Sequence, residues 1–485
     1  MSGRCRVSES GGEFEVVIGL EVHAHLRTES KLFSPAPIFY GAEPNHGVHP
    51  VCLALPGVLP VLNERAVELA IRASLAMNCK VHRRSIFARK SYFYPDLPKG
   101  YQISQYEEPL ATGGWVDIPV EGAGGSANKR PIHLTRIHME EDAGKSIHDD
   151  AIAGSDATLV DLNRAGVPMI EIVSEPDLRS AEEASAYLRA IRSILRFTEV
   201  SDADMEKGHL RCDVNISLRP RGSDEYGTRT ELKNLNSFRF IEDAANAEIG
   251  RQAEVLREGG RVQQCTLSYD PRSGRTSVLR IKEDADDYRY FPDPDLIPLL
   301  LSEGEIERVL SEVPELAEQR SERFQSEYGL SEYDAAQLTA SPSVADFFEA
   351  AAKQHGAPKV VANWILRDVM QALKERELAI DDSPFSPDGL ARLIRMVDES
   401  KTTVKSARGL VAELVESGGD PEVLVAERGL AAVSEVLAEN PENVELFRSG
   451  EEKVVNFLMG QVMRKTRGKA DPAAVREILA RELQK

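Results

Sequence analysis

The 485-residue sequence lacks several features that would place it in a specialised class of protein. No run of 18 apolar residues occurs, so we expect no transmembrane helix and no membrane association. The segment Met1 to Gly12 is polar and has no apolar centre, so we expect no secretory signal. The five cysteines are odd in number and never form a Cys-x-x-Cys motif, which fits neither a disulfide scaffold nor a zinc knuckle. We therefore expect reduced thiols in a cytoplasmic protein.

An excess of positive charge is also missing. The chain carries 59 Lys and Arg against 79 Asp and Glu, a formal net charge of −20. A protein that covers its whole surface with nucleic acid or anionic membrane does not have this balance. Any contact with RNA must therefore be local, on a basic patch of an acidic body. The sequence shows no internal repeat and no low-complexity tract, and its length predicts roughly three domains.

The part before about residue 295 mixes strand and helix patterns. Glu15–His23 is short and rich in β-branched residues, and Leu210–Leu218 alternates apolar and polar residues, so both predict strands. Asn63–Met77 and Ala181–Phe197 have apolar residues at helical spacing, and Ser180 is a candidate N-cap for the second helix. Strands and helices without a regular βαβ repeat predict the α+β class.

The pattern after Pro298 is helical almost throughout. Glu303–Val313 and Val344–Gln354 are predicted helices, and Ser343 is the candidate N-cap of the second. Turn signals interrupt the pattern again in the last part of the chain. We therefore predict an α+β domain over 1–295, a helical domain over 296–403 and a helical tail over 404–485.

Polar residues alternate along the first predicted strand. Glu21, His23 and His25 stand two residues apart, so they share one face of the strand. A carboxylate beside an imidazole can hold a divalent cation, and Mg²⁺ or Mn²⁺ is favoured over structural zinc because paired cysteines are missing. The alternative is the polar face of a half-buried strand, which alternation alone would also produce.

Three acidic residues in a row, Glu140 to Asp142, precede a Gly-Lys-Ser sequence. A phosphate-binding P-loop is rejected, because Met139 stands where that motif needs its first glycine. The acidic run is either a solvated face or a Mg²⁺ site, with Lys145 placed to meet a phosphate.

Two further carboxylates lie within predicted strands. Glu171 is surrounded by apolar residues and Asp213 lies in the second predicted strand, so each is either a strand residue that reaches solvent or a ligand on a rigid strand. The segments 233–239 and 280–292 mix Arg and Lys with aromatic or polar residues. Such segments suit a nucleotide or an RNA end, although each taken singly is more often structural.

Six segments in a fixed order resemble one known family, the B subunits (GatB) of tRNA-dependent amidotransferases. The resemblance extends over essentially the whole chain. The segments are Val17–His23, Arg89–Asp96, His138–Lys145, Leu210–Asp213, Glu231–Phe238 and Asp287–Pro292.

The resemblance implies a mixed-sheet cradle domain, a helical domain and a YqeY-like helical tail. It also implies a heterotrimeric ligase in which the B subunit, with ATP and Mg²⁺, phosphorylates the side-chain carboxylate of Glu-tRNA(Gln) or Asp-tRNA(Asn). Ammonia from an amidase subunit (GatA-like) then displaces phosphate, and a small C subunit (GatC-like) joins the two large ones. This chain contains no Ser-Ser-Lys amidase signature, so the glutaminase must lie in the partner.

The resemblance also assigns residues. Glu21, His23, Glu141, Glu171 and Asp213 match the metal-binding positions of the family, and we expect them to converge in one cavity. Lys90 and Lys99 match positions that line the ammonia route, and Glu141 could serve both functions. Together with His23, these three residues form the expected catalytic set.

The end of the chain is locally basic. Between Glu451 and Lys485, eight Lys and Arg face five Asp and Glu, a local net charge of +3. The densest basic stretch contains Arg464, Lys465, Arg467 and Lys469, which we expect to contact the tRNA backbone. A solvated helix end is the alternative.

Two other functions compete with the amidotransferase. A stand-alone kinase or ATP-grasp-like ligase for a small carboxylate would share the acyl-phosphate chemistry and act on free glutamate. A non-catalytic RNA-binding adaptor would bind tRNA normally without ATP hydrolysis.

Overall fold

The computed structural model describes residues 13–121, 127–147, 157–281, 288–399, 401–402, 404–449, 451, 453–466, 468, 470 and 472–483. The chain divides into two compact units, Met1–Pro314 and Glu315–Lys485. No helix among the described residues is long and apolar enough to cross a membrane. The cysteines in the described ranges, Cys52, Cys79, Cys212 and Cys265, are free and buried.

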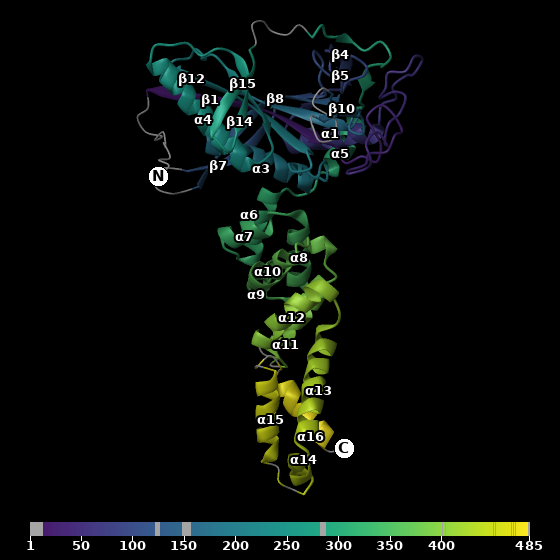
Figure 1. Ribbon diagram of the computed structural model, residues 1–485, viewed down its shortest axis with the longest axis vertical. Helices are drawn as coiled ribbons and strands as arrows, with labels where there is room; N and C mark the ends of the chain where they lie inside the picture. The colour runs from purple at the N-terminus through teal and green to yellow at the C-terminus, as the bar shows by residue number, and fades with distance from the viewer. Residues whose placement is uncertain are drawn as a thin grey trace. The chain divides into compact units, whose positions relative to one another are not determined.

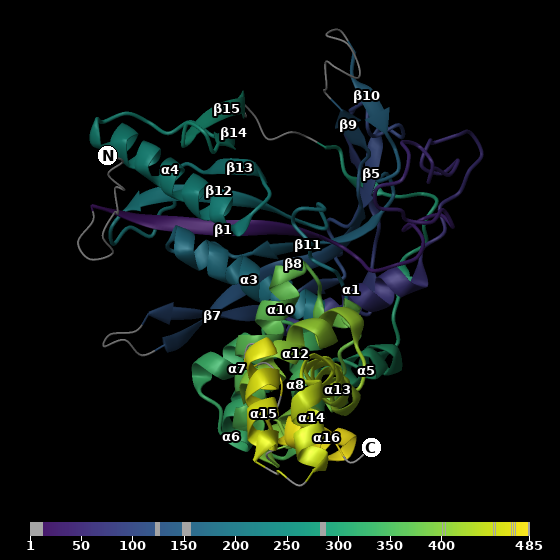
Figure 2. The same ribbon diagram turned by 60° about the horizontal axis from the view of Figure 1, so that its bottom comes forward.

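The first unit is built on a ten-stranded sheet with the order β15-β14-β13-β12-β1-β11-β8-β6-β2, with β7 paired to β8. Figure 2 shows β1 between β12 and β11. The β13–β14 pair is parallel and the other pairs of this sheet are antiparallel, so the sheet is mixed. Its strands are β1 (Phe14–His25), β2 (Lys80–Val81), β6 (Ala111–Thr112), β7 (Trp115–Glu121), β8 (Ala127–Glu141), β11 (Pro168–Ser174), β12 (Leu210–Pro220), β13 (Thr230–Leu235), β14 (Cys265–Asp270) and β15 (Arg275–Ile281).

Three smaller sheets and four helices complete the described part of this unit. The small sheets are formed by β16, β4 and β5, by β10 and β9, and by β17 and β3. Their strands are β3 (Arg84–Ser85), β4 (Ala88–Ser91), β5 (Tyr101–Ser104), β9 (Lys145–Ile147), β10 (Leu159–Asp161), β16 (Phe291–Pro292) and β17 (Leu299–Leu300). The helices are α1 (Glu64–Ala76), α3 (Ala181–Phe197), α4 (Phe238–Arg257) and α5 (Glu303–Ser311).

One face of the large sheet forms the core of this unit. In β1 the even-numbered residues Ile18, Leu20, Val22 and Ala24 are buried in a cluster with apolar residues of α1, α3 and α4. Helices α3 and α4 pack against each other and against strands of the sheet (Figure 1). Because strand side chains alternate between faces, the odd-numbered residues of β1 lie on the opposite face, which is left for polar groups.

The second unit is entirely helical in its described residues (Figure 1). Two apolar clusters fill it, one from Phe324 to Val425 and one from Ala432 to Leu483. Its elements are α6 (Ala317–Tyr328), α7 (Glu332–Leu338), α8 (Pro342–His355), α9 (Pro358–Trp364), a π-helical turn (Ile365–Val369), α10 (Met370–Glu375), a 3₁₀ turn (Ile380–Asp382), α11 (Pro387–Asp398), α12 (Val404–Ser417), α13 (Pro421–Glu439), α14 (Pro441–Arg448), α15 (Val454–Lys465) and α16 (Pro472–Leu483).

The predicted α+β class is confirmed, and so are the elements predicted around the site. Helix α3 begins after Ser180, whose side chain accepts a hydrogen bond from the Glu183 amide. One predicted cap is wrong: α8 begins after Ser341, and the Ser343 hydroxyl hydrogen-bonds to Asp381. Pro342 occupies the first helical position, where its missing amide hydrogen costs nothing, so the helix starts before Ser343.

Candidate active site

The register of three strands brings predicted site residues together on the polar face of the large sheet. On β1, Glu21 stands opposite Asp213 of β12, and His23 stands opposite Glu171 of β11. Paired residues of antiparallel strands share a face. Four of the five predicted metal ligands therefore lie on one face, although they come from three strands distant in sequence.

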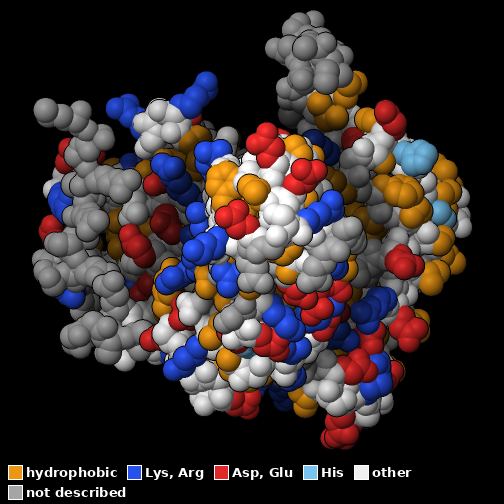
Figure 3. Space-filling view, turned by 90° about the horizontal axis from the view of Figure 1, so that it is seen from below, with side chains coloured by type: hydrophobic (Ala, Val, Ile, Leu, Met, Phe, Trp, Pro, Cys, Tyr) orange, Lys and Arg blue, Asp and Glu red, His pale blue; other side chains and the backbone are white. Residues whose placement is uncertain are grey.

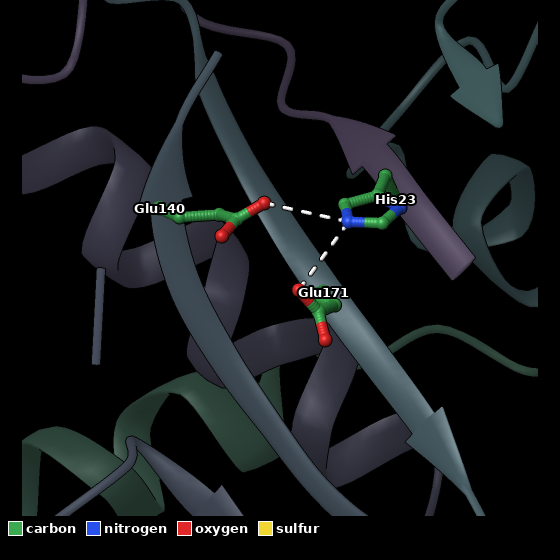
Figure 4. A group of neighbouring side chains, drawn as sticks. All are labelled: His23, Glu140 and Glu171. Atoms are coloured by element: carbon green, nitrogen blue, oxygen red, sulfur yellow. Dashed lines mark ion pairs between the residues drawn. The ribbon is translucent and has the colours of Figure 1, made fainter. Parts of the chain in front are cut away.

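The first acidic group consists of His23, Glu140 and Glu171. The His23 Nε2 atom lies 3.3 Å from a Glu171 carboxylate oxygen and 3.5 Å from a Glu140 oxygen. Figure 4 shows the three side chains pointing toward one another from β1, β8 and β11. Both carboxylates are buried. His138, also buried, places its Nε2 atom 3.5 Å from Glu171.

Electrostatics holds this group in its ionised form. Burial favours neutral imidazole, but the hydrogen bond to Glu171 and the charges of Glu171 and Glu140 outweigh it and raise the pKa of His23 to about 9. Burial likewise opposes the charge of Lys90, yet Glu140, together with Tyr290 and Glu171, raises the Lys90 pKa above its usual value. The two carboxylates thus favour the charged forms of both His23 and Lys90.

The second acidic group consists of Glu21, Asp213 and Glu231. Burial and then repulsion from neighbouring carboxylates, Glu171 first, raise the pKa of Glu21. The Lys233 ammonium donates to Asp213 at 2.7 Å and lies 3.2 Å from Glu231, which offsets part of this negative charge. The Asn215 amide donates to Glu21 at 3.0 Å.

Both groups fit a divalent cation. In each, three ligand atoms from three residues lie within 4.8 Å of one another. The donors are carboxylate oxygens with one imidazole nitrogen, which must release its proton to bind a metal, and the carboxylate-rich set is the one that Mg²⁺ and Mn²⁺ prefer. The second group places three carboxylates side by side with Lys233 as their cationic neighbour, an arrangement that a divalent cation can join.

The structure does not bring Glu141 to either group. Glu140 and Glu141 are consecutive residues of β8, so their side chains leave opposite faces of the sheet. Glu141 is buried in an ion pair with Lys99 and accepts a hydrogen bond from the Ile103 amide at 3.0 Å. Of the residues matched to the ammonia route, Lys99 therefore lies with Glu141, and Lys90 lies near Glu140 and Glu171.

A buried network lies beside the first group. The His25 Nε2 atom is 2.7 Å from an Asp142 oxygen, and Arg211 donates to the same carboxylate at 2.7 Å. Burial would raise the pKa of Asp142, but Arg211 and His25 hold it well below its usual range. Asp142 thus has its charge balanced by neighbouring side chains and is not grouped with the candidate ligands.

The predicted RNA-binding residues lie in the tail, and the structure describes two of them. Lys465, at the end of α15, forms ion pairs with Glu435 at 2.9 Å and with Glu439 of α13. Arg464 is exposed and donates to Gln461 at 2.6 Å. Arg467 and Lys469 lie outside the described residues. Figure 3 shows basic and acidic side chains interspersed on the face that it draws.

The ligand set assigned from the sequence left out two members of these groups, Glu140 and Glu231, although the acidic run that contains Glu140 was one candidate Mg²⁺ site. A signal for Glu140 was present, because the apolar residues Ile137 and Met139 alternate with His138 and Glu140 and set the phase of the strand. Glu231 belongs to a motif that the sequence analysis noted, but its pairing with Glu21 depends on the order of β13, β12 and β1. Nothing in the local sequence fixes that order.

The fold and the site define a protein of two units. An α+β unit carries a carboxylate-rich candidate metal centre, and a helical unit follows it in the chain. Residues 16–307 match the model of the GatB/GatE catalytic domain, and residues 346–483 match the model of the GatB domain. The chain therefore belongs to the GatB family, the B subunits of aspartyl/glutamyl-tRNA(Asn/Gln) amidotransferases, as the order of its motifs predicted.

Close relatives extend over nearly the whole chain. The B subunit of the aspartyl/glutamyl-tRNA(Asn/Gln) amidotransferase from Nitratidesulfovibrio vulgaris strain DP4 is 53% identical over 480 residues, which is 97% of this chain and 99% of the relative. The corresponding protein of Persephonella marina is 50% identical over 96% of this chain and 99% of its own length. That of Geotalea daltonii is 49% identical over 97% and 100%.

Proposed function

We propose that this chain activates the side-chain carboxylate of Glu on tRNA(Gln), or of Asp on tRNA(Asn), with ATP and then amidates it. The observation that carries the proposal is the pair of acidic groups on one sheet face, with Lys90 beside the first and Lys233 beside the second. Such an arrangement suits phosphoryl transfer, which needs charge compensation and positioning more than covalent help from the protein.

The reaction needs activation because ammonia does not attack a resonance-stabilised carboxylate. A carboxylate oxygen attacks the γ-phosphorus of ATP, and ADP leaves. Ammonia then attacks the carbonyl carbon of the acyl phosphate, and phosphate leaves with the former carboxylate oxygen. The products are Gln-tRNA(Gln) or Asn-tRNA(Asn), ADP and phosphate.

The side chains divide this work between them. His23, Glu140 and Glu171 would hold one Mg²⁺, and Glu21, Asp213 and Glu231 a second. When bound, Mg²⁺ neutralises phosphate charge. Lys90 lies near Glu140 and Glu171, where its ammonium is placed to meet the negative charge of a transferring phosphoryl group. Lys233 gives similar compensation at the second group.

Ammonia is proposed to approach past Lys99 and Glu141. This pair is buried at the end of β8, next to β5, on the opposite side of the sheet from the acidic groups. The pair supplies buried polar atoms, and the Gln102 side chain, which donates to the Glu141 carbonyl at 2.8 Å, adds another. We therefore assign Glu141 to the ammonia route and Glu140 to the metal centre, which divides the two functions first expected of Glu141.

The proposed partners follow from this chemistry. A GatA-like amidase subunit supplies ammonia from glutamine, and a GatC-like subunit completes a heterotrimer. The helical tail contacts the tRNA backbone, with Arg464 exposed and available and Lys465 paired to α13. We propose a cytoplasmic location, where misacylated tRNA is formed.

The direct test is mass spectrometry of the amino acid released from tRNA. The assembled subunits are incubated with ATP, glutamine and Glu-tRNA(Gln) or Asp-tRNA(Asn). The proposal expects a mass decrease of about 1 Da on the amino acid, since an amide replaces a carboxylic acid, and only with ATP present. Amidation of free glutamate at the same rate would favour the small-molecule ligase, and tRNA binding without ATP consumption would favour the adaptor.

A further inference from the structure

Lys31 is buried in the first unit without a carboxylate partner. It is 1% exposed, and it forms no ion pair with the residues that the structure describes. Its ammonium donates instead to the Cys52 sulfur at 3.6 Å and to the Leu162 carbonyl at 3.4 Å. Lysine is almost never fully buried unless it is paired. The buried thiol of Cys52 is thus the side-chain partner of this lysine.

The chemistry of the two groups favours a reactive pair. An ammonium stabilises the thiolate form of a cysteine beside it, and the thiolate is the nucleophilic form of the sulfur. Burial lowers the pKa of Lys31, although the neighbouring Cys52 opposes this shift. Once the thiolate charge is gone, the Lys31 amine therefore becomes neutral, and itself nucleophilic, more readily than the amine of an exposed lysine.

A space for one further atom borders both side chains. Gly166 has a left-handed φ of +84°, and the position that its missing Cβ would occupy lies 3.5 Å from Lys31 Cδ and 3.6 Å from Cys52 Sγ. The third neighbour of this position is a Glu141 carboxylate oxygen at 3.8 Å. All three are ordinary contact distances, so an oxygen atom added to the Cys52 sulfur has room there.

Cys52 lies in a turn close to the protein surface. Its amide donates to the His49 carbonyl at 2.8 Å, which closes the turn. Cys52 itself is 6% exposed, but Leu53 and Leu55, which follow it, are 38% and 47% exposed. The sulfur is therefore buried one residue away from solvent-exposed chain, within reach of a molecule as small as hydrogen peroxide.

We propose that hydrogen peroxide joins Lys31 and Cys52 through a reversible sulfur–nitrogen bond, a sulfenamide. The Cys52 thiolate attacks one peroxide oxygen, the O–O bond breaks, and the sulfur becomes a sulfenic acid while hydroxide leaves. Hydroxide takes a proton from the Lys31 ammonium and becomes water. The neutral Nζ then attacks the sulfur, and the S–OH bond breaks as its hydroxide takes a second Nζ proton. The sulfur is oxidised by two electrons, and the peroxide is reduced to two molecules of water.

The bond regulates the ammonia route, a consequence that rests on the proposed function. It removes a positive charge that attracts Glu141, and it ties Lys31 to the surface turn. Ammonia delivery past Glu141 is then impaired, while the acidic groups on the other face of the sheet still consume ATP. A cellular thiol reverses the bond by attacking the sulfur and releasing the Lys31 amine.

The bond is read from the mass of one tryptic peptide of the assembled complex. The segment Thr28–Arg65 contains Lys31 and Cys52 and no other Lys or Arg before its last residue. The complex is treated with hydrogen peroxide, free thiols are alkylated, and the protein is digested without reductant. Trypsin cleaves the unbridged chain after Lys31, whereas the bridged chain should give intact Thr28–Arg65, about 2 Da lighter than its unmodified mass. Dithiothreitol added before digestion should restore the cleavage.

One variant and one other thiol identify the attacking group. Lys31→Arg keeps the positive charge, but a guanidinium does not attack the sulfur, so Cys52 should stop at the sulfenic acid. Dimedone, which labels sulfenic acids, should therefore modify Cys52 at least about tenfold more in Lys31→Arg than in the unsubstituted protein. Cys79 is the internal control, because burial raises its pKa to about 12 and it should remain a free thiol.

Activity assays show the consequence for the ammonia route. After peroxide treatment, glutamine-dependent amidation should be at least about tenfold lower in the unsubstituted complex than in an equally treated Cys52→Ala complex. ATP hydrolysis in the two complexes should differ by less than about twofold. Equal loss of amidation in both complexes would overturn the regulation of the ammonia route by this bond.

Two results would overturn the bond itself. The first is the absence of the lighter Thr28–Arg65 peptide after peroxide treatment, a result that needs no variant and so does not depend on the folding of Lys31→Arg. The second is equal dimedone labelling of Cys52 in the unsubstituted protein and in folded Lys31→Arg. Failure of the proposed function is distinct from both, because the untreated complex would then form no amide while the peptide masses still report the bond.

Discussion

Glu140 and Glu141 are adjacent in sequence but are assigned to different functions, so replacing each by Gln gives opposite expected results. Glu140→Gln removes one of the three ligand side chains of the first acidic group. Loss of one electrostatic stabilising group typically lowers kcat by about 10²–10³-fold, or about 2.7–4 kcal/mol. We expect a loss of this size in tRNA-dependent ATP hydrolysis. Glu141→Gln should retain this hydrolysis per folded molecule and lose glutamine-dependent amidation.

The order is reversed for the free energy of unfolding, which Glu141→Gln should lower more than Glu140→Gln. The Lys99 and Glu141 side chains are 6% and 4% exposed, so Glu141→Gln leaves a buried ammonium without its counter-charge. Breaking a buried pair in this way costs about 3–5 kcal/mol of the free energy of unfolding. Replacing both residues with Met should recover part of that loss, since no charge then remains buried. The part not recovered reflects the hydrogen bond from the Ile103 amide.

Two assays separate these effects. Phosphate release with misacylated tRNA measures ATP hydrolysis, and urea denaturation measures the free energy of unfolding. The reasoning is refuted if Glu141→Gln loses ATP hydrolysis as completely as Glu140→Gln while its stability is unchanged. Glu141 would then act with the acidic groups despite its position on the other face of the sheet.

Three further predictions follow from the site and the tail. His23→Ala should abolish ATP hydrolysis and amidation while the partner glutaminase keeps basal activity, as measured by glutamate release; full amidation would contradict it. Mn²⁺ titration followed by electron paramagnetic resonance should detect bound Mn²⁺, which a chelator removes and Glu171→Gln weakens; equal binding in both proteins would remove Glu171 from the site. Combined alanine substitution in the tail should raise the KM for tRNA and flatten its salt dependence, at unchanged melting temperature; unchanged KM at low and high salt would exclude the tail from tRNA binding. The substituted residues are Arg464, Lys465, Arg467 and Lys469.

Local patterns predicted the elements that position the site. Alternation placed Glu21 and His23 on one face of β1, and the structure has both on the polar face of the sheet. Ser180 predicted the start of α3 because a serine before an amphipathic helix can accept an amide hydrogen bond, and it does so from Glu183. Both inferences needed only a few neighbouring residues.

Features that depend on distant pairing could not be read in the same way. The run Glu140 to Asp142 has three acidic residues. Only the register of β8 against β11 shows that Glu140 is the one that lies beside His23 and Glu171. Glu231 reaches Glu21 because β12 lies between their strands. Lys465 looked like part of a free basic patch, but its partners Glu435 and Glu439 lie on another helix. Each case was decided by an element far away in the sequence.

The central claim is that ATP activates the carboxylate carried by the tRNA, and transfer of ¹⁸O tests it most directly. Glu-tRNA(Gln) with both side-chain carboxylate oxygens labelled is incubated with the assembled subunits, ATP and glutamine, and the released phosphate is analysed by mass spectrometry. Because phosphate leaves with the former carboxylate oxygen, we predict one ¹⁸O in the phosphate for each amide formed. Amide formation with unlabelled phosphate would contradict the account.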